Sequence, residues 1–295
     1  MERRLLGKTG LQVSALGFGG SEIRDADQHT VDYLLNAALD AGLNTLDTAE
    51  CYGDSEEKIG KSVSTRRGDF HLFTKCGHDG EALGGSDWDP ATLMKSIDRS
   101  LERLQVDHVD LVQLHTCSKE QLEQGDVIEV LQRAKEAGKT RFIGYSGDNE
   151  AATYAVACGA FDTLQTSVNI ADQGCIDGWV ADAKAAHMGV IAKRPIANAA
   201  WRPAAENDGY ARVYRDRLSV LDFPFLKDEM HDIETALRFT LTVPGVSTLI
   251  VGTNKPDRWK GNAALASGGA LTVEEYESIR KLWHEIAGED WRAQG

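Results

Sequence analysis

Short apolar segments alternate with helix-like segments along the chain, and this rhythm limits the possible folds more than any other feature. The expected strands lie at 15–20, 43–47, 70–75, 109–114, 141–146, 163–167, 189–192 and 247–251. Helical patterns separate them at 28–41, 55–64, 90–104, 126–137, 150–158, 175–186 and 229–241. Strands that alternate with helices predict a parallel sheet, and the strands lack a regular polar–apolar alternation, which indicates that both faces are buried.

Eight such repeats favour an α/β fold of the (β/α)8 TIM-barrel class. We expect two additions, an N-terminal β-hairpin that turns at Gly7-Lys8-Thr9-Gly10 and a C-terminal helix at 272–287. The chain has 295 residues, 42% of them hydrophobic, and no linker-like segment divides it. Because a barrel of this class needs roughly 250 residues, we expect a single domain over 1–295.

Two glycine-containing segments resemble nucleotide-binding loops but lack residues that those loops require. Gly60-Lys61-Ser62 ends like a phosphate-binding P-loop, yet the glycine required five residues earlier is Ser55. Gly17-Phe18-Gly19 is followed at the third glycine position by Glu22. The sequence therefore indicates neither a P-loop nor the dinucleotide fingerprint of an open sheet.

Charge and composition narrow the possible partners. The net charge of −14 argues against nucleic acid or an anionic membrane as a partner. The sequence has no secretory signal and no run of about 20 apolar residues, so we expect a cytoplasmic protein. Its five cysteines are odd in number and form no CxxC motif, which fits a reducing compartment. We expect no metal site, because no spaced set of ligands accompanies them.

Four polar side chains stand at or just beyond the ends of three consecutive expected strands. Asp47 and Tyr52 follow one strand, Lys75 ends the next, and His115 follows the third. In a parallel barrel these strand ends meet at one rim, where the sites of such barrels lie. We therefore expect an acid, a phenol, an amine and an imidazole to lie together.

Together these four groups can deliver a proton to a carbonyl oxygen. Tyr52 is the candidate general acid, and the Lys75 ammonium would lower the pKa of its phenol. Asp47 would hold Lys75 and keep it protonated, while His115 would bind and orient the carbonyl oxygen. None of these groups supplies electrons, so the site implies a hydride donor, a nicotinamide cofactor.

Three cysteines, Cys51, Cys76 and Cys117, lie within two residues of members of this group. We expect them to be small packed residues near strand ends. Oxidation-sensitive thiols at the rim of the site are the alternative interpretation.

The chain resembles the aldo-keto reductase family over nearly its whole length. Its similar motifs are Leu16–Gly20, Leu46–Ala49, Tyr52–Glu56, Ile143–Ser146 and Gln165 with Asn169, in the order and spacing of the family. The resemblance implies reduction of an aldehyde or ketone to an alcohol, or the reverse, with Asp47, Tyr52, Lys75 and His115 as the catalytic tetrad. It also implies small-molecule carbonyl or alcohol substrates, while the oligomeric state is not predicted.

The same resemblance implies a set of cofactor contacts and favours NADP(H) over NAD(H). The implied residues are Gly20, Asp47, Ser146, Gln165, Lys193, Arg194, Pro195, Ile196, Gly252, Thr253, Asn254, Arg258 and Asn262. Arg258 is expected at the 2′-phosphate, since a guanidinium suits a phosphate. Gly252 stands where many members carry a basic residue, which predicts a weaker preference for NADPH. Lys193 or Arg194 is expected at the cofactor phosphate or ring.

Two alternative functions remain open at this point. One is a cofactor-binding regulatory or redox-sensing subunit of the same fold with slow turnover, and the other is a Schiff-base lyase that uses Lys75. Substrate choice is expected to depend on the loops 79–89 and 194–227, because specificity in this architecture belongs to loops. Arginines of the second loop, among them Arg217, would either meet an anionic ligand or be solvated.

Overall fold

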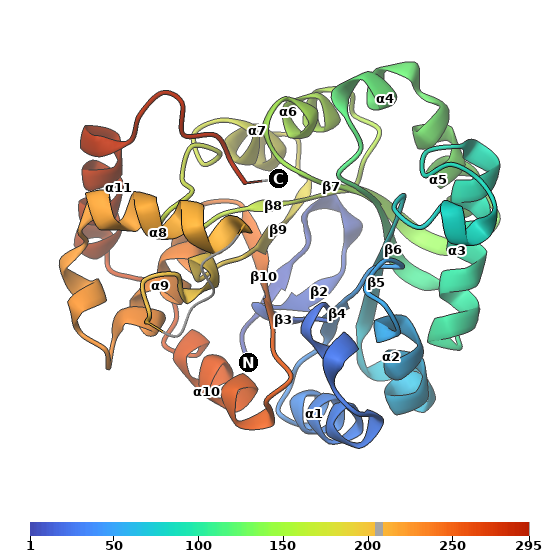
Figure 1. Cartoon of the computed structure of the whole chain (residues 1–295), viewed down its shortest axis with the longest axis horizontal. Helices are drawn as coiled ribbons and strands as arrows, with labels where there is room; N and C mark the ends of the chain where they lie inside the picture. Colours follow the sequence, from blue (N-terminus) through green and yellow to red (C-terminus); the bar gives the residue numbers. More distant parts are fainter. Residues whose placement is uncertain (204–208, 295) are drawn as a thin grey trace.

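Eight parallel strands form a closed barrel in the computed structural model, which describes residues 1–203 and 209–294 (Figure 1). The strands pair around the barrel in the order β10, β3, β4, β5, β6, β7, β8, β9. Their bounds are β3 Leu16–Gly19, β4 Thr45–Asp47, β5 His71–Cys76, β6 Val109–His115, β7 Thr140–Ser146, β8 Thr163–Ser167, β9 Gly189–Lys193 and β10 Val246–Gly252. The predicted barrel and the positions of its strands are confirmed.

Helices surround the barrel and cover the outer face of its strands (Figure 1). Their bounds are α1 Gln28–Asp40, α2 Ser55–Val63, α3 Pro90–Leu104, α4 Lys119–Gln124, α5 Asp126–Glu136, α6 Asn149–Ala157, α7 Trp179–Ala185, α8 Gly209–Leu221, α9 Asp232–Thr242, α10 Pro256–Ala266 and α11 Val273–Ile286. Local sequence fixes several of their starts. Asp89 caps α3 by accepting a hydrogen bond from Thr92 N, and Pro90 follows at the first helical position.

The N-terminal hairpin closes one end of the barrel. Its strands β1 (Arg3–Leu5) and β2 (Gln12–Ser14) pair antiparallel. Leu6, Leu11 and Val13 pack against side chains of the barrel interior, which are Phe73, Leu111, Ile191 and Ile250. Gly7 lies against the backbone at the start of β9, where a Cβ atom would come within 2.2 Å of Gly189 N. The hairpin therefore seals the end at which the strands begin.

The expected loop at 194–227 is partly wrong, because it contains the helix α8. Tyr214, Leu218 and Leu221 recur at helical spacing and are buried. Arg217 is also buried, and it donates hydrogen bonds to Ala171 O and Arg292 O. This arginine is neither solvated nor open to a ligand. Residues 204–208 of the expected loop lie outside the described residues.

Two smaller differences concern helix bounds. The short helix α4 was not expected, although Ser118 and Gln121 form a capping box at its start. The helix expected from residue 175 begins at Trp179, since the preceding residues form turns.

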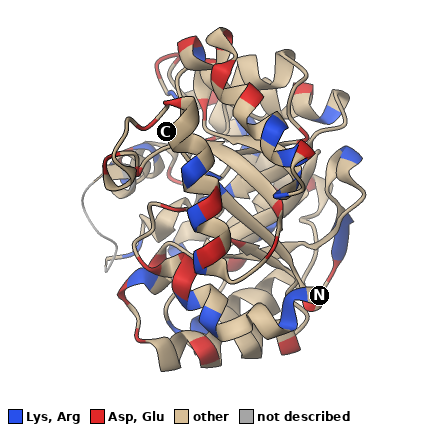
Figure 2. Ribbon diagram, turned by 90° about the vertical axis from the view of Figure 1, so that its right-hand side faces the viewer, with Lys and Arg blue, Asp and Glu red and all other residues tan. Residues whose placement is uncertain are grey.

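Figure 2 shows acidic and basic residues intermixed along the helices that face the viewer in that orientation. Within the described part of the chain, no helix combines the length and apolar character that crossing a bilayer requires.

Candidate active site

The structure brings the four candidate catalytic residues together at the ends of three neighbouring strands. Asp47 ends β4, Lys75 lies near the end of β5, and His115 ends β6. Tyr52 lies in the turn between β4 and α2. Strand β5 pairs with both β4 and β6, so the three strand ends are adjacent.

A buried ion pair joins Asp47 and Lys75. Lys75 Nζ lies 2.5 Å from Asp47 Oδ2 and donates a second hydrogen bond to Thr48 O at 2.8 Å. The two side chains are only 2% and 4% exposed. Burial is the largest single influence and would lower the pKa of Lys75, but the charge and hydrogen bond of Asp47 together with Tyr52 outweigh it, and the pKa is raised. Lys75 is therefore a fixed cation.

Tyr52 lies over this cation. Lys75 Nζ is 5.2 Å from the centroid of the Tyr52 ring. Burial raises the pKa of the Tyr52 phenol, and this effect outweighs the lowering by Lys75. The expected net lowering is therefore absent in this structure. The phenol keeps its proton at neutral pH, which is the state that a proton donor requires.

His115 lies edge-on to Tyr52, with 5.7 Å between ring centroids. Burial lowers the pKa of its imidazole well below the ordinary value, and the charge of Lys75 lowers it further. The ring is therefore neutral at physiological pH. A neutral imidazole has one N–H, which can donate a hydrogen bond to a carbonyl oxygen.

The residues expected at the nicotinamide carboxamide are linked to the ion pair. Ser146 Oγ donates to Gln165 Oε1 at 2.9 Å, and Gln165 Nε2 lies 3.1 Å from Asp47 Oδ1. Gly20 N donates to Asp47 O at 2.7 Å, which fixes the backbone on the other side of Asp47. An amide and a hydroxyl beside the catalytic group fit the polar carboxamide of a nicotinamide.

Lys193 and Arg194 have partners within the protein. Lys193 Nζ lies 2.8 Å from Asp148 Oδ2, and Arg194 donates to Ser167 Oγ at 2.9 Å. Arg194 also donates to the backbone carbonyl of Gln294, so the C-terminal segment reaches the mouth of the barrel. Either cation would have to exchange a protein contact for a contact to the cofactor.

The remaining predicted contacts lie at or beyond the ends of β9 and β10. Thr253 and Asn254 precede α10, and Thr253 Oγ1 accepts a hydrogen bond from Lys255 N at 3.1 Å. Arg258 is exposed on the first turn of α10. A helix N-terminus with an exposed arginine fits a phosphate. The other members of the set are Pro195 and Ile196 after β9, Gly252 at the end of β10, and Asn262, which is buried within α10.

Comparison of the chain with known proteins agrees with this fold and this arrangement of residues. The profile of the Aldo/keto reductase family matches residues 15–284. The chain belongs to the aldo/keto reductase family. L-galactose dehydrogenase from Arabidopsis thaliana is 31% identical over 95% of this chain and 90% of its own length. The 6-dehydroglucose reductase from Novosphingobium aromaticivorans is 35% identical, but over 48% of this chain and 50% of its own length.

Solved structures give the same result. The holo form of the aldo-keto reductase AKR11C1 from Bacillus halodurans superposes with a TM-score of 0.84 and 29% identity, covering 96% of each chain. As an oxidoreductase of this family, the chain joins relatives that typically use a nicotinamide cofactor and small-molecule carbonyl substrates. The fold expected from the family resemblance is confirmed.

The sequence analysis missed Gln113 at the site of this aldo/keto reductase, and it assigned Cys51 no contact with the tetrad. Gln113 Nε2 lies 3.4 Å from Asp47 Oδ1, and Cys51 Sγ lies 3.5 Å from His115 Nδ1. Gln113 is a buried polar residue in an otherwise apolar stretch of β6, which was a usable signal. For Cys51 the only signal in the sequence was its position beside Tyr52. Cys76 and Cys117 are buried, as expected for packed residues.

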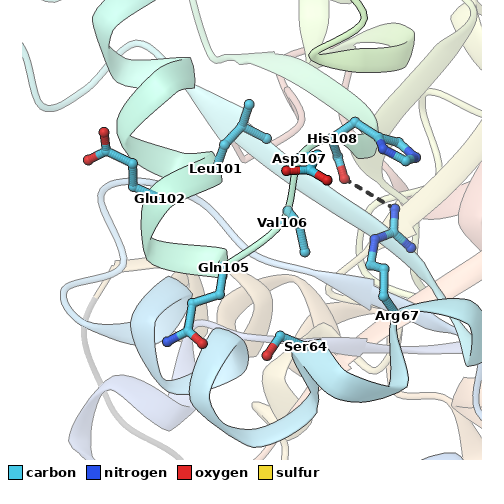
Figure 3. Close-up of a pocket in the computed structure, with 8 residues that line it drawn as sticks. All are labelled: Ser64, Arg67, Leu101, Glu102, Gln105, Val106, Asp107 and His108. Atoms are coloured by element: carbon cyan, nitrogen blue, oxygen red, sulfur yellow. Dashed lines mark hydrogen bonds between the residues drawn. The ribbon is translucent and has the colours of Figure 1, made fainter.

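No described group of histidine, cysteine and acidic residues could hold a metal ion. A cavity of about 530 Å³ lies beside the segments that precede β5 and β6, at the end where these strands begin (Figure 3). It is lined by Ser64, Arg67, Leu101, Glu102, Gln105, Val106, Asp107 and His108. In barrels of this class the catalytic face is the opposite one.

Proposed function

We propose that this protein is an NAD(P)H-dependent aldo-keto reductase that reduces an aldehyde or ketone to an alcohol, or oxidises the alcohol. The observation that carries the proposal is the buried Asp47–Lys75 pair beneath Tyr52, with His115 beside it. A bound nicotinamide cofactor supplies the hydride. We further propose that residues 1–295 act as one domain in the cytoplasm, which the free state of all five cysteines supports.

The protein residues would handle the proton in this reaction. His115 donates a hydrogen bond to the carbonyl oxygen and orients it. Tyr52 gives its phenolic proton to that oxygen as the carbon is reduced, and Lys75 stabilises the phenolate left behind. Asp47 holds the ammonium in place through a hydrogen bond within their buried ion pair. Solvent returns the proton to Tyr52 in the next cycle.

The cofactor contacts favour NADP(H) over NAD(H). Ser146 and Gln165 would hold the carboxamide, Asp47 and Gly20 would border the ring, and Lys193 to Ile196 would flank the ring and pyrophosphate. Arg258 would hold the 2′-phosphate, with Thr253, Asn254 and Asn262 nearby. Gly252 adds no positive side chain near the 2′-phosphate, which supports only a modest preference for NADP(H).

A Schiff-base lyase is less well supported. Such a mechanism needs a neutral, nucleophilic amine. Lys75 is paired with Asp47 and has a raised pKa, so its amine is protonated.

The test is a screen of NADPH and NADH oxidation over aldehydes, ketones and sugars. Sugars come first, because relatives include an L-galactose dehydrogenase and a 6-dehydroglucose reductase. We expect turnover by the wild type and a loss of about 10³-fold in Tyr52→Phe, with cofactor binding unchanged by fluorescence titration. Turnover by Tyr52→Phe at the wild-type rate would contradict the role of Tyr52. Cofactor binding with only slow turnover across the panel would favour the regulatory alternative.

A further inference from the structure

The imidazole of His115 has one hydrogen-bond partner among the described residues, and that partner is a thiol. Cys51 Sγ lies 3.5 Å from Nδ1 of the imidazole. Cys51 directly precedes Tyr52, so one short turn presents both the phenol and the thiol to the site. The structure records no hydrogen bond of the other ring nitrogen, Nε2, within the part of the chain that it describes.

Neighbouring rings fix the plane of the imidazole. The Tyr52 ring meets it at 80° and the His78 ring at 71°, with centroids 5.7 and 5.1 Å away. These edge-on contacts restrict rotation of His115 but do not decide which nitrogen carries the proton. The hydrogen bond of Nδ1 decides that, since the partner of one ring nitrogen sets the protonation of the other.

The chemistry of the two partners gives the direction of this hydrogen bond. Burial raises the pKa of the Cys51 thiol to about 11, and the neighbouring Glu50 adds to this effect, so the sulfur carries its proton. The charged or titratable groups that act on the imidazole are Lys75, His78, Lys193 and Arg194, and with burial they keep it neutral. A thiol is a weak donor and its sulfur a weak acceptor, whereas an unprotonated imidazole nitrogen is a good acceptor. The S–H group therefore donates to Nδ1.

We propose that Cys51 is a positioning residue that holds His115 in the tautomer with its proton on Nε2. In this tautomer Nε2–H faces away from Cys51 and donates to the carbonyl oxygen of the substrate. Cys51 itself touches neither substrate nor cofactor. The mechanistic consequence rests on the proposed reductase function, whereas the tautomer itself does not.

The first experiment measures the tautomer directly. Nitrogen-15 NMR of the enzyme labelled at histidine, with His115→Gln used to assign the signals, distinguishes a protonated from an unprotonated ring nitrogen. We expect a protonated Nε2 and an unprotonated Nδ1 in the wild type at neutral pH. A protonated Nδ1 in the wild type would overturn the proposal. This readout needs no turnover, so it stands or fails separately from the reductase function.

The second experiment separates the hydrogen bond from the volume of the side chain. Cys51→Val fills the space without a donor, and Cys51→Ser restores a donor. We expect kcat to fall about tenfold in Cys51→Val, less than the loss of at least about 100-fold typical when an acid–base group itself is removed. Cys51→Ser should recover most of the rate and the wild-type NMR pattern, and the KM for NADPH should stay the same in both. Cys158→Ser, at an exposed cysteine elsewhere, is the control.

Two results would overturn the proposal: a Cys51→Val variant with wild-type tautomer and kcat, or a Cys51→Ser variant no better than Cys51→Val. Thermal unfolding of each variant shows whether it folds. If Cys51→Val fails to fold, the wild-type tautomer and a comparison of Cys51→Ser with the wild type still decide: a loss of kcat in Cys51→Ser as large as that expected for Cys51→Val would overturn the proposal.

Discussion

Both ends of the barrel hold a buried carboxylate paired with basic side chains, but only one end is suited to catalysis. Asp47, at the ends of the strands, faces Lys75. Asp110, near the start of β6, accepts hydrogen bonds from Arg67 and Arg141, each at 2.7 Å, and from Leu72 N at 2.9 Å. Its pKa is held below the ordinary value, because His71 and Arg67 outweigh the effect of burial.

The difference between the two clusters lies in what surrounds the cation. Lys75 is 2% exposed, and its Nζ lies 5.2 Å from the centroid of the Tyr52 ring. Arg67 and Arg141 are 24% and 49% exposed, and Arg67 also donates hydrogen bonds to the backbone oxygens of Phe70 and His108. A buried ion pair therefore does not by itself mark an active site. The phenol of Tyr52, with the imidazole of His115 beside it, distinguishes the Asp47–Lys75 pair.

The largest expected effect comes from removing the cation at each end. Lys75→Met should lower kcat by about 10³-fold or more, because Tyr52 loses the charge that stabilises its phenolate. The matched variant Arg67→Met should leave kcat of the folded protein within about twofold, since it lies at the other end. Steady-state NADPH oxidation compares the two. Equal losses of kcat would remove the distinction between the ends.

A large effect on stability is expected at the opposite end. Asp110→Asn should lower the free energy of unfolding by about 2–3 kcal/mol, below the usual cost of breaking a buried pair because both arginines are partly exposed. Urea unfolding at pH 7 measures this change, and kcat should remain that of the wild type. A change below about 0.5 kcal/mol would show that the Asp110 cluster is not a structural element.

The same cluster predicts a pH dependence of stability. A carboxyl group with a lowered folded-state pKa stabilises the fold above the unfolded-state value, near ~3.9, and loses this contribution as pH falls toward the folded-state value. The stability difference between wild type and Asp110→Asn should therefore be constant from about pH 7 to 5 and shrink below about pH 4. Unfolding curves across this range test the sign. A difference that grows on acidification would be inconsistent with a lowered pKa.

The smallest effect is expected at the outer edge of the catalytic end. Arg258→Ala should raise the KM for NADPH about tenfold and leave the KM for NADH nearly unchanged, because only NADPH carries the 2′-phosphate. The exposed Lys260, on the same helix, offers a matched control as Lys260→Ala. Parallel rises in both KM values would place Arg258 away from that phosphate.

The sequence was sufficient for the barrel and for the meeting of Asp47, Tyr52, Lys75 and His115. Strand ends in a parallel barrel are neighbours by topology, so residues at corresponding positions come together without any knowledge of side-chain packing. Helix α8 was missed because three arginines among its residues suggested a solvated segment, although Tyr214, Leu218 and Leu221 carried a helical spacing.

Contacts between distant segments were beyond the sequence analysis. The thiol of Cys51 meets His115 across 64 positions, and the carbonyl of Gln294 meets Arg194 across 100. Neither contact has a local pattern, because each depends on where two loops converge. The net pKa of Tyr52 was equally hidden, since the balance between desolvation and the charge of Lys75 requires the buried geometry.

Among the described residues the catalytic end is the open end of the barrel, because the hairpin formed by β1 and β2 covers the opposite one. Leu6, Leu11 and Val13 fill the other end and share their packing with the interior. Any two ligands that meet at Tyr52 must then enter through the same opening. The ligand that binds deeper therefore has to bind first and dissociate last. Closure of one end of the barrel thus imposes an order of ligand binding and release on the reaction at the other end.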